Sequence, residues 1–141
     1  MAAAPVGDAS RGAWRVLLVD DSADDAELAE YALRKGRLEV ECRRACTAAG
    51  VAQALREFAP QVVVSDLNLP GFSGAEALAL TRAHDPDLPF VFLTGALLPG
   101  EAPPLADGLL LKDELDALPR LLRQLLAVQA GNHVAELLTG K

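Results

Sequence analysis

The chain has 141 residues, a length typical of one domain, and its 51% hydrophobic and 23% charged residues suffice for a globular core. It carries 13 basic against 20 acidic residues, a net charge of −7, which disfavours binding to nucleic-acid phosphates. Its apolar runs are far shorter than the roughly 20 residues of a membrane-spanning helix, so we expect neither a nucleic-acid nor a membrane partner.

The N-terminal residues 1–13 are rich in alanine and glycine and lack the apolar stretch of a secretory signal, so we expect a disordered extension. Two cysteines, Cys42 and Cys46, are too few for a disulfide framework or a metal cage. On one strand they would lie about 13 Å apart, too far to bridge. We therefore expect a cytoplasmic protein whose cysteines are free thiols.

Five segments are predicted to be strands. Four apolar runs without alternation, each bounded by polar or turn residues, are typical of strands buried on both faces of a parallel sheet. These runs are 16–19, 62–64, 90–93 and 109–111. Residues 38–43 instead alternate between apolar and polar side chains, which predicts a half-exposed strand at a sheet edge.

Helical patterns lie between these strands. The first helix begins at the capping-box-like sequence Ser22-Ala-Asp-Asp25 and ends at Gly36, which can take the left-handed conformation. Thr47 can cap a second helix that runs to Pro60, and a third spans residue 74 to about residue 83. The predicted elements therefore alternate between strand and helix.

The C-terminal part departs from this alternation. The segment 95–106 contains three prolines and a glycine at its centre and has no room for a full helix. The last helix runs from about Leu118 to Val128, because Pro119 is tolerated only in a first turn. Residues 131–141 are expected to form a tail with one loose extra turn, so that the domain spans 14–130.

Alternating strands and helices with right-handed crossovers predict an α/β fold, a doubly wound parallel sheet with helices on both faces. Polar side chains stand at the carboxyl ends of the four apolar strands. The ends are Asp20-Asp21, Ser65-Asp66, Thr94-Gly95 and Lys112. Open parallel sheets bind ligands at the carboxyl ends of their strands, so we expect these side chains to converge there.

Three neighbouring carboxylates repel one another unless a cation lies between them. Mg²⁺, with Mn²⁺ as the alternative, fits such oxygen ligands and leaves coordination positions for phosphate oxygens. Beside this ion Asp66 can act as a nucleophile toward a phosphoryl group, while Lys112 supplies a positive charge and Thr94 a hydroxyl donor. Taken alone, Asp21 could equally be a helix cap.

Four segments carry a family resemblance: Arg15-Val-Leu-Leu-Val-Asp-Asp-Ser22, Val63-Val-Ser-Asp-Leu-Asn-Leu-Pro-Gly-Phe-Ser-Gly74, Pro89-Phe-Val-Phe-Leu-Thr-Gly-Ala96 and Leu109-Leu-Leu-Lys-Asp113. Over about residues 14–130 the chain resembles the receiver domain of two-component response regulators. The resemblance implies a flavodoxin-like fold with strand order 2-1-3-4-5. It also implies that a histidine kinase or phosphotransfer protein phosphorylates Asp66.

The same resemblance implies a role for each site residue. Asp21 and Asp66 would ligate Mg²⁺ directly, Asp20 would act mainly through a bound water, and Asn68 would contribute its backbone carbonyl. Thr94 and Lys112 would engage the phosphoryl group and report its presence.

The sequence departs from the family pattern at three points. The fourth helix is short or missing, Leu109 stands where an aromatic switch residue is usual, and Lys112 is followed by Asp113 in place of the common proline. The phosphorylation site is unaffected by these differences, whereas the surface that reads out its state is altered.

The leading hypothesis is therefore a phosphorylated signalling switch without an attached output domain. It would catalyse only its own Mg²⁺-dependent phosphorylation and dephosphorylation, and it would signal by protein–protein interaction. A haloacid-dehalogenase-type phosphatase would need an aspartate as general acid two residues after the nucleophile, where this chain has Asn68. The alternative is an interaction module that keeps the fold and ignores phosphate.

Overall fold

The computed structural model describes residues 12–97, 100 and 103–138, with side chains up to residue 128. Its elements in chain order are β1 (Trp14–Val19), α2 (Ala23–Lys35), β2 (Val40–Ala45), α3 (Ala48–Glu57), β3 (Val62–Ser65), β4 (Asn68–Leu69), β5 (Phe72–Ser73), α4 (Gly74–His84), β6 (Phe90–Thr94), β7 (Gly108–Leu111), the 3₁₀ helix η1 (Lys112–Ala117) and α5 (Leu118–Leu138). The predicted N-terminal extension lies almost entirely outside the described residues.

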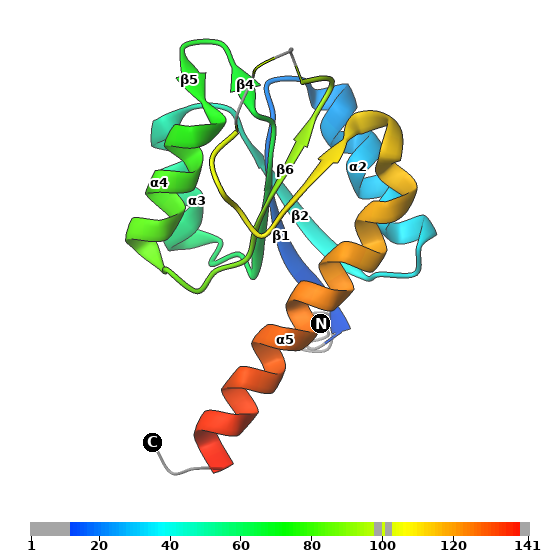
Figure 1. Ribbon diagram of the computed structural model, residues 1–141, viewed down its shortest axis with the longest axis vertical. Coiled ribbons are helices and arrows are strands. Elements are labelled where there is room, and N and C mark those ends of the chain that lie inside the picture. Colours follow the sequence, from blue (N-terminus) through cyan, green and yellow to red (C-terminus); the bar gives the residue numbers. More distant parts are fainter. Residues whose placement is uncertain (1–11, 98–99, 101–102, 139–141) are drawn as a thin grey trace, which may run out of the picture.

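A five-stranded parallel sheet forms the centre of the molecule, in the order β2-β1-β3-β6-β7 (Figure 1). Helices α2 and α5 cover one face and α3 and α4 cover the other. The predicted doubly wound fold and its strand order 2-1-3-4-5 are confirmed, counting the five strands of this sheet alone. The short antiparallel hairpin β4-β5 was not predicted.

Two apolar clusters hold the layers together, because alternate residues of each central strand point to opposite faces. In β1, Leu17 and Val19 pack with α3 and α4, whereas Val16 and Leu18 pack with α2 and α5. The runs in β1, β3 and β6 are buried throughout, as predicted. Strand β2 pairs only with β1 and is half-exposed, which confirms the predicted edge strand.

The prediction that residues 109–111 are buried on both faces is wrong. All residues of β7 are only partly buried, because β7 is the other edge strand and pairs with β6 alone. No helix is formed by the described residues between β6 and β7, in agreement with a short or missing fourth helix. A full helix at this point in the chain would supply the cover that β7 lacks.

The side chain of Asp107 fastens the chain directly before β7. Its Oδ2 accepts hydrogen bonds from the backbone N–H of Phe90, at 2.8 Å, and from Arg82 in α4, at 3.1 Å. The backbone N–H of Asp107 in turn donates to the carbonyl of Phe90 at 2.9 Å. The chain therefore re-enters the sheet at a fixed point beside β6.

The helix starts agree with the sequence. Ser22 caps α2 and Thr47 caps α3, each with its side chain accepting from a backbone N–H three residues later. The end of α2 corrects one prediction, since Gly36 has φ −78° and the left-handed residue is Arg37, with φ 67°. Gly36 is required by space instead, because a Cβ there would lie 2.5 Å from the Pro119 ring of α5.

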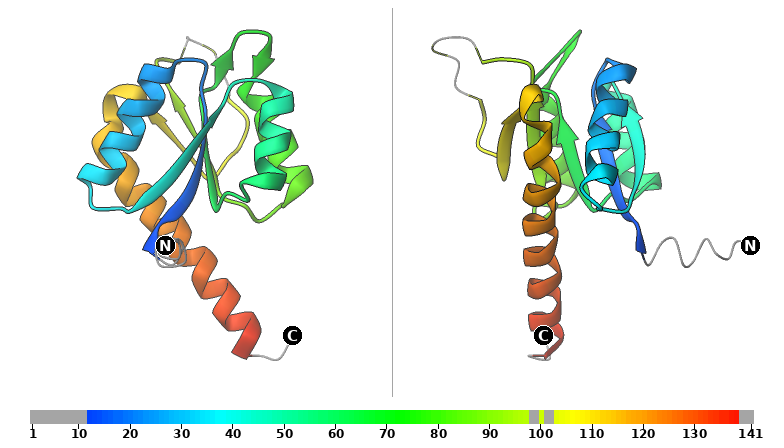
Figure 2. Two further views of the ribbon diagram at one scale, coloured as in Figure 1. Left: turned by 180° about the vertical axis from the view of Figure 1, so that it is seen from behind. Right: turned by 90° about the vertical axis from the view of Figure 1, so that its right-hand side faces the viewer.

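Helix α5 begins at Leu118 with Pro119 in its first turn, as predicted, but it continues to Leu138 where we expected an end near Val128. The predicted boundary at residue 130 thus falls inside a helix, and α5 projects beyond the sheet (Figure 2). Within the part of the chain described, none of the helices is both long and apolar enough to span a bilayer.

Candidate functional site

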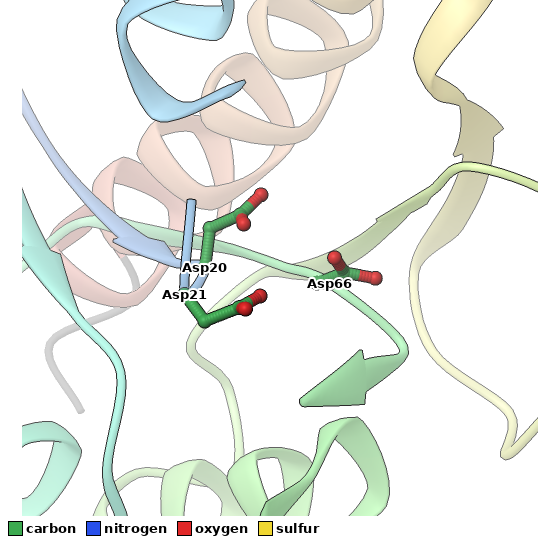
Figure 3. A group of neighbouring side chains, drawn as sticks. All are labelled: Asp20, Asp21 and Asp66. Atoms are coloured by element: carbon green, nitrogen blue, oxygen red, sulfur yellow. The ribbon is translucent and has the colours of Figure 1, made fainter. Parts of the chain in front are cut away.

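Three carboxylates meet at the carboxyl edge of the sheet. Asp20 and Asp21 directly follow β1, and Asp66 directly follows β3, the strand paired with β1 through Val19 and Ser65. One carboxylate oxygen from each lies within 4.8 Å of the others (Figure 3). Asp20 is buried, Asp66 is half-buried and Asp21 is exposed. The predicted convergence of these three residues is confirmed.

Backbone N–H groups orient two of these carboxylates. Asp20 Oδ1 accepts from the N–H of Ser22 at 2.9 Å, and Asp66 Oδ1 accepts from the N–H of Asn68 at 3.3 Å. The Asp66 N–H donates to the Val19 carbonyl at 2.8 Å, which ties the loop after β3 to the end of β1. Backbone N–H groups of neighbouring residues therefore fix the orientation of both carboxylates.

Lys112 lies among the carboxylates. Its Nζ is 2.9 Å from Asp20 Oδ2 and 3.0 Å from Asp66 Oδ2, and it also contacts Asp25 Oδ2 at 2.7 Å. Burial lowers the pKa of Lys112, but hydrogen bonds to Asp25, Asp20 and Asp66 outweigh it and leave the pKa above its usual value. Lys112 is therefore a fixed positive charge beside Asp66.

Thr94 and Asn68 reach the same end of the sheet in different ways. Thr94 is the last residue of β6, fully buried, and its register partner in β7 is Leu111, the residue before Lys112. Asn68 lies in β4 and is exposed. Ligation of a metal by the Asn68 carbonyl and contact of Thr94 with a phosphoryl group remain predictions.

Two residues of this site were not predicted. Asp25 was predicted only as part of a helix cap, yet its carboxylate makes the shortest contact with Lys112. The guanidinium of Arg44 donates to the Asp20 backbone carbonyl at 3.1 Å. The available signal was positional: the first turn of α2 and the end of β2 both lie at the carboxyl edge.

The donor set fits a divalent cation. Opposite ligands of Mg²⁺ lie about 4.2 Å apart, for bonds of about 2.1 Å. The three carboxylate oxygens lie within 4.8 Å of one another, a separation at which they can share one ion directly or through a water. Asp20 and Asp66 each present one oxygen to Lys112 and the other to a backbone N–H, which leaves further lone pairs on both for an ion.

Sequence comparison gives the family. The family model described as "Response regulator receiver domain" matches residues 16–99, more than half of the chain. The chain is 37% identical over 83 residues to the transcriptional regulatory protein PrrA of Mycobacterium tuberculosis, and 38% identical over 80 residues to its DNA-binding response regulator MtrA. Each match covers 57% of this chain and 34% of the relative, so the chain spans about a third of these relatives' length.

Solved structures agree on the fold. The signal receiver domain of a putative Luxo repressor protein from Vibrio parahaemolyticus matches with a TM-score of 0.71 at 22% identity, over 88% of this chain and 98% of that one. A putative response regulator from Chloroflexus aurantiacus matches with a TM-score of 0.63 at 28% identity, over 82% and 98%. Both the sequence and the fold thus point to one family.

Proposed function

The chain belongs to the response regulator receiver domain family, and from this membership we propose that Asp66 accepts a phosphoryl group from a histidine kinase or a phosphotransfer protein. The observation that supports this proposal most is the placement of Lys112 Nζ, 3.0 Å from Asp66 and inside a cluster of three carboxylates. Open parallel sheets bind ligands at this edge, so Lys112 is placed to meet an anionic group brought to Asp66.

The proposed reaction is a transfer to a carboxylate. An oxygen of Asp66 attacks the phosphorus of the donor, an O–P bond forms, and the bond from phosphorus to the leaving group breaks with its electron pair on the leaving group. The positive charge of Lys112 attracts the phosphoryl oxygens, and Thr94 can donate its hydroxyl proton to one of them. Both side chains stabilise the negative charge of the phosphoryl group, which on Asp66 lies next to other carboxylates.

We propose that a Mg²⁺ ion would bind directly to Asp21 and Asp66. Asp20 would contribute through a water and Asn68 through its backbone carbonyl. When bound, this ion would neutralise charge on the carboxylates and on the phosphoryl oxygens, and Mn²⁺ could replace it. The chain's own residues orient the nucleophile, since the N–H of Asn68 fixes one oxygen of Asp66.

Phosphorylation would bias the domain between two conformations, and the phosphorylated form would signal by binding another protein. We propose a switch in the cytoplasm whose only catalysis is its own phosphorylation and dephosphorylation. The relatives' printed names include DNA binding and transcriptional regulation. For the residues of this chain we propose protein partners alone, because the net charge is −7.

Intact mass measured after incubation with Mg²⁺ and acetyl phosphate tests this function. We expect a gain of one phosphoryl group, lost in Asp66→Asn and lost when EDTA replaces Mg²⁺. An unlabelled wild-type chain that also fails to bind a beryllofluoride mimic would contradict the proposal. It would favour the phosphate-independent interaction module, because the mimic does not depend on the lifetime of the aspartyl phosphate.

A further inference from the structure

Lys112 is held by one carboxylate that lies outside the acidic cluster. An ammonium group has three protons, and Nζ of Lys112 has three carboxylate partners. Asp20 and Asp66 belong to the cluster that can hold a metal, whereas Asp25 is not one of its three members. The contact with Asp25 is nevertheless the shortest, at 2.7 Å.

Phosphorylation changes the contact between Lys112 and Asp66. If Asp66 is phosphorylated, as proposed above, one carboxylate oxygen becomes the bridging oxygen of an acyl phosphate, and the negative charge then lies on the phosphoryl oxygens. The Lys112 N–H that points at Asp66 can then donate to a phosphoryl oxygen, the stronger acceptor. A cation shared by the cluster competes for Asp20 as well. Asp25 is the partner that neither event removes.

Asp25 is itself well fixed. It lies in the first turn of α2, where its backbone N–H donates to the Ser22 hydroxyl that caps the helix, at 3.1 Å. Lys112, by contrast, directly follows the half-exposed edge strand β7 and opens a 3₁₀ helix. The long side chain of Lys112, next to an edge strand, is thus bound to the capped first turn of α2.

We propose that Asp25 is the positioning residue of this site, the anchor that keeps the ammonium of Lys112 in place while its contact with Asp66 is exchanged for one with the phosphoryl group. The proposal rests on the proposed function. Asp25 touches neither the attacking oxygen nor the phosphorus, and it acts only through Lys112.

The test compares initial rates of labelling by acetyl phosphate at saturating Mg²⁺, measured by intact mass. Asp25→Ala should label about fivefold more slowly, the factor of an ion pair worth about 1 kcal/mol at a partly exposed site. Asp25→Glu should restore much of the rate, and the isosteric Asp25→Asn should fall between. Asp24→Ala is the matched control, because Asp24 is an exposed acid of the same helical turn.

A double-mutant cycle separates positioning from a general structural role. In a Lys112→Ala background, followed until a tenth of the chains carry a phosphoryl group, Asp25→Ala should cause no further loss of rate. Thermal unfolding of every variant is measured in parallel to confirm that each is folded.

Three results would overturn the inference. They are an Asp25→Ala rate equal to or above that of the wild type, an equal loss in Asp24→Ala, and an undiminished fivefold loss in the Lys112→Ala background. Each of these leaves Asp66 labelled and the proposed function intact. A wild-type chain that is not labelled, or labelling that survives Asp66→Asn, would instead remove the proposed function and this inference with it.

Discussion

Burial separates the chemistry of the two cysteines. Cys42 lies partly buried in β2, where burial, together with the negative charge of Glu30, raises its pKa to about 12. At pH 8 only about one Cys42 in ten thousand is then a thiolate, the reactive form. Cys46 follows β2 and is exposed.

We therefore expect one fast and one slow thiol when the folded protein is titrated with Ellman's reagent at pH 8. The fast phase belongs to Cys46 and should disappear in Cys46→Ser, whereas the slow phase should speed up when urea unfolds the chain and exposes Cys42. Loss of the fast phase in Cys42→Ser would show that the assignment is wrong.

Single residues at this site were predictable where they end a strand. Asp20, Asp66 and Lys112 were found because the apolar run before each of them marks the strand end. The role of Asp25 was not predictable, because an acidic residue in the first turn of a helix is already explained by helix capping. Its partner Lys112 is distant in the sequence and is brought close only by the fold. The predicted reason for a glycine at position 36, a left-handed conformation, was wrong. The actual reason is its close contact with Pro119, which depends on how α2 packs against α5.

At the scale of elements, α4 is packed closely against the loop that carries Asp66. A Cβ added to Gly74, the first residue of α4, would lie 2.5 Å from the Asp66 carbonyl oxygen and 2.8 Å from Cα of Leu67. Both neighbours are backbone atoms and cannot move without moving the loop.

Gly74→Ala should therefore destabilise the domain by about 1–3 kcal/mol, the usual cost of overpacking, and slow the labelling of Asp66. Urea unfolding and intact mass measure the two effects. Gly95→Ala is the control for stability, because a Cβ at Gly95 meets no atom within 4 Å among the described residues. Equal stabilities of the two variants would refute the packing argument.

The position of the chain directly before β7 depends on the hydrogen bonds of Asp107. Asp107→Ala leaves the Phe90 N–H without its acceptor and removes the pair with Arg82, so we expect a loss of about 1–2 kcal/mol in urea unfolding. Asp107→Asn keeps an acceptor oxygen and should lose less. If Ala and Asn cost the same, the hydrogen bond to Phe90 contributes little.

Elements were predicted where their pattern is long enough to have a period. The two-residue strands β4 and β5 are too short for this, and they form because the loop after Asp66 folds back on itself. The half-exposure of β7 follows from its edge position, which an apolar run alone does not report. Helix α5 was expected to end near Val128 but continues through Gly131, because a single glycine only weakens a helix.

At the scale of the whole molecule, the topology was the most predictable feature, because alternation of strands and helices leaves few arrangements with right-handed crossovers. Four acidic side chains gather where this topology brings strand ends together. One ammonium, that of Lys112, neutralises only part of the charge of Asp20, Asp25 and Asp66, and the exposed Asp21 adds to the excess.

A bound divalent cation should therefore stabilise the fold. At Mg²⁺ concentrations about tenfold above the dissociation constant, linkage gives about 1.4 kcal/mol, or a rise in Tm of roughly 5 °C. Differential scanning fluorimetry with NaCl of equal ionic strength as control measures this rise. Asp21→Asn should raise the Tm without Mg²⁺, because it relieves repulsion between carboxylates. The same substitution should abolish most of the rise in Tm caused by Mg²⁺. A rise of the same size with NaCl would exclude a specific site.

The projecting end of α5 has a mechanical consequence. The chain passes from Lys112 through η1 directly into α5, whose first turns are fixed to the sheet by Leu118, Leu122 and Leu126. From Leu126 to Leu138 the helix rises about 18 Å, so a rotation of about 10° at the sheet would carry its tip roughly 3 Å. A small rotation where α5 meets the sheet, next to the element that begins with Lys112, would therefore be magnified at the far end of the helix, beyond the opposite edge of the sheet.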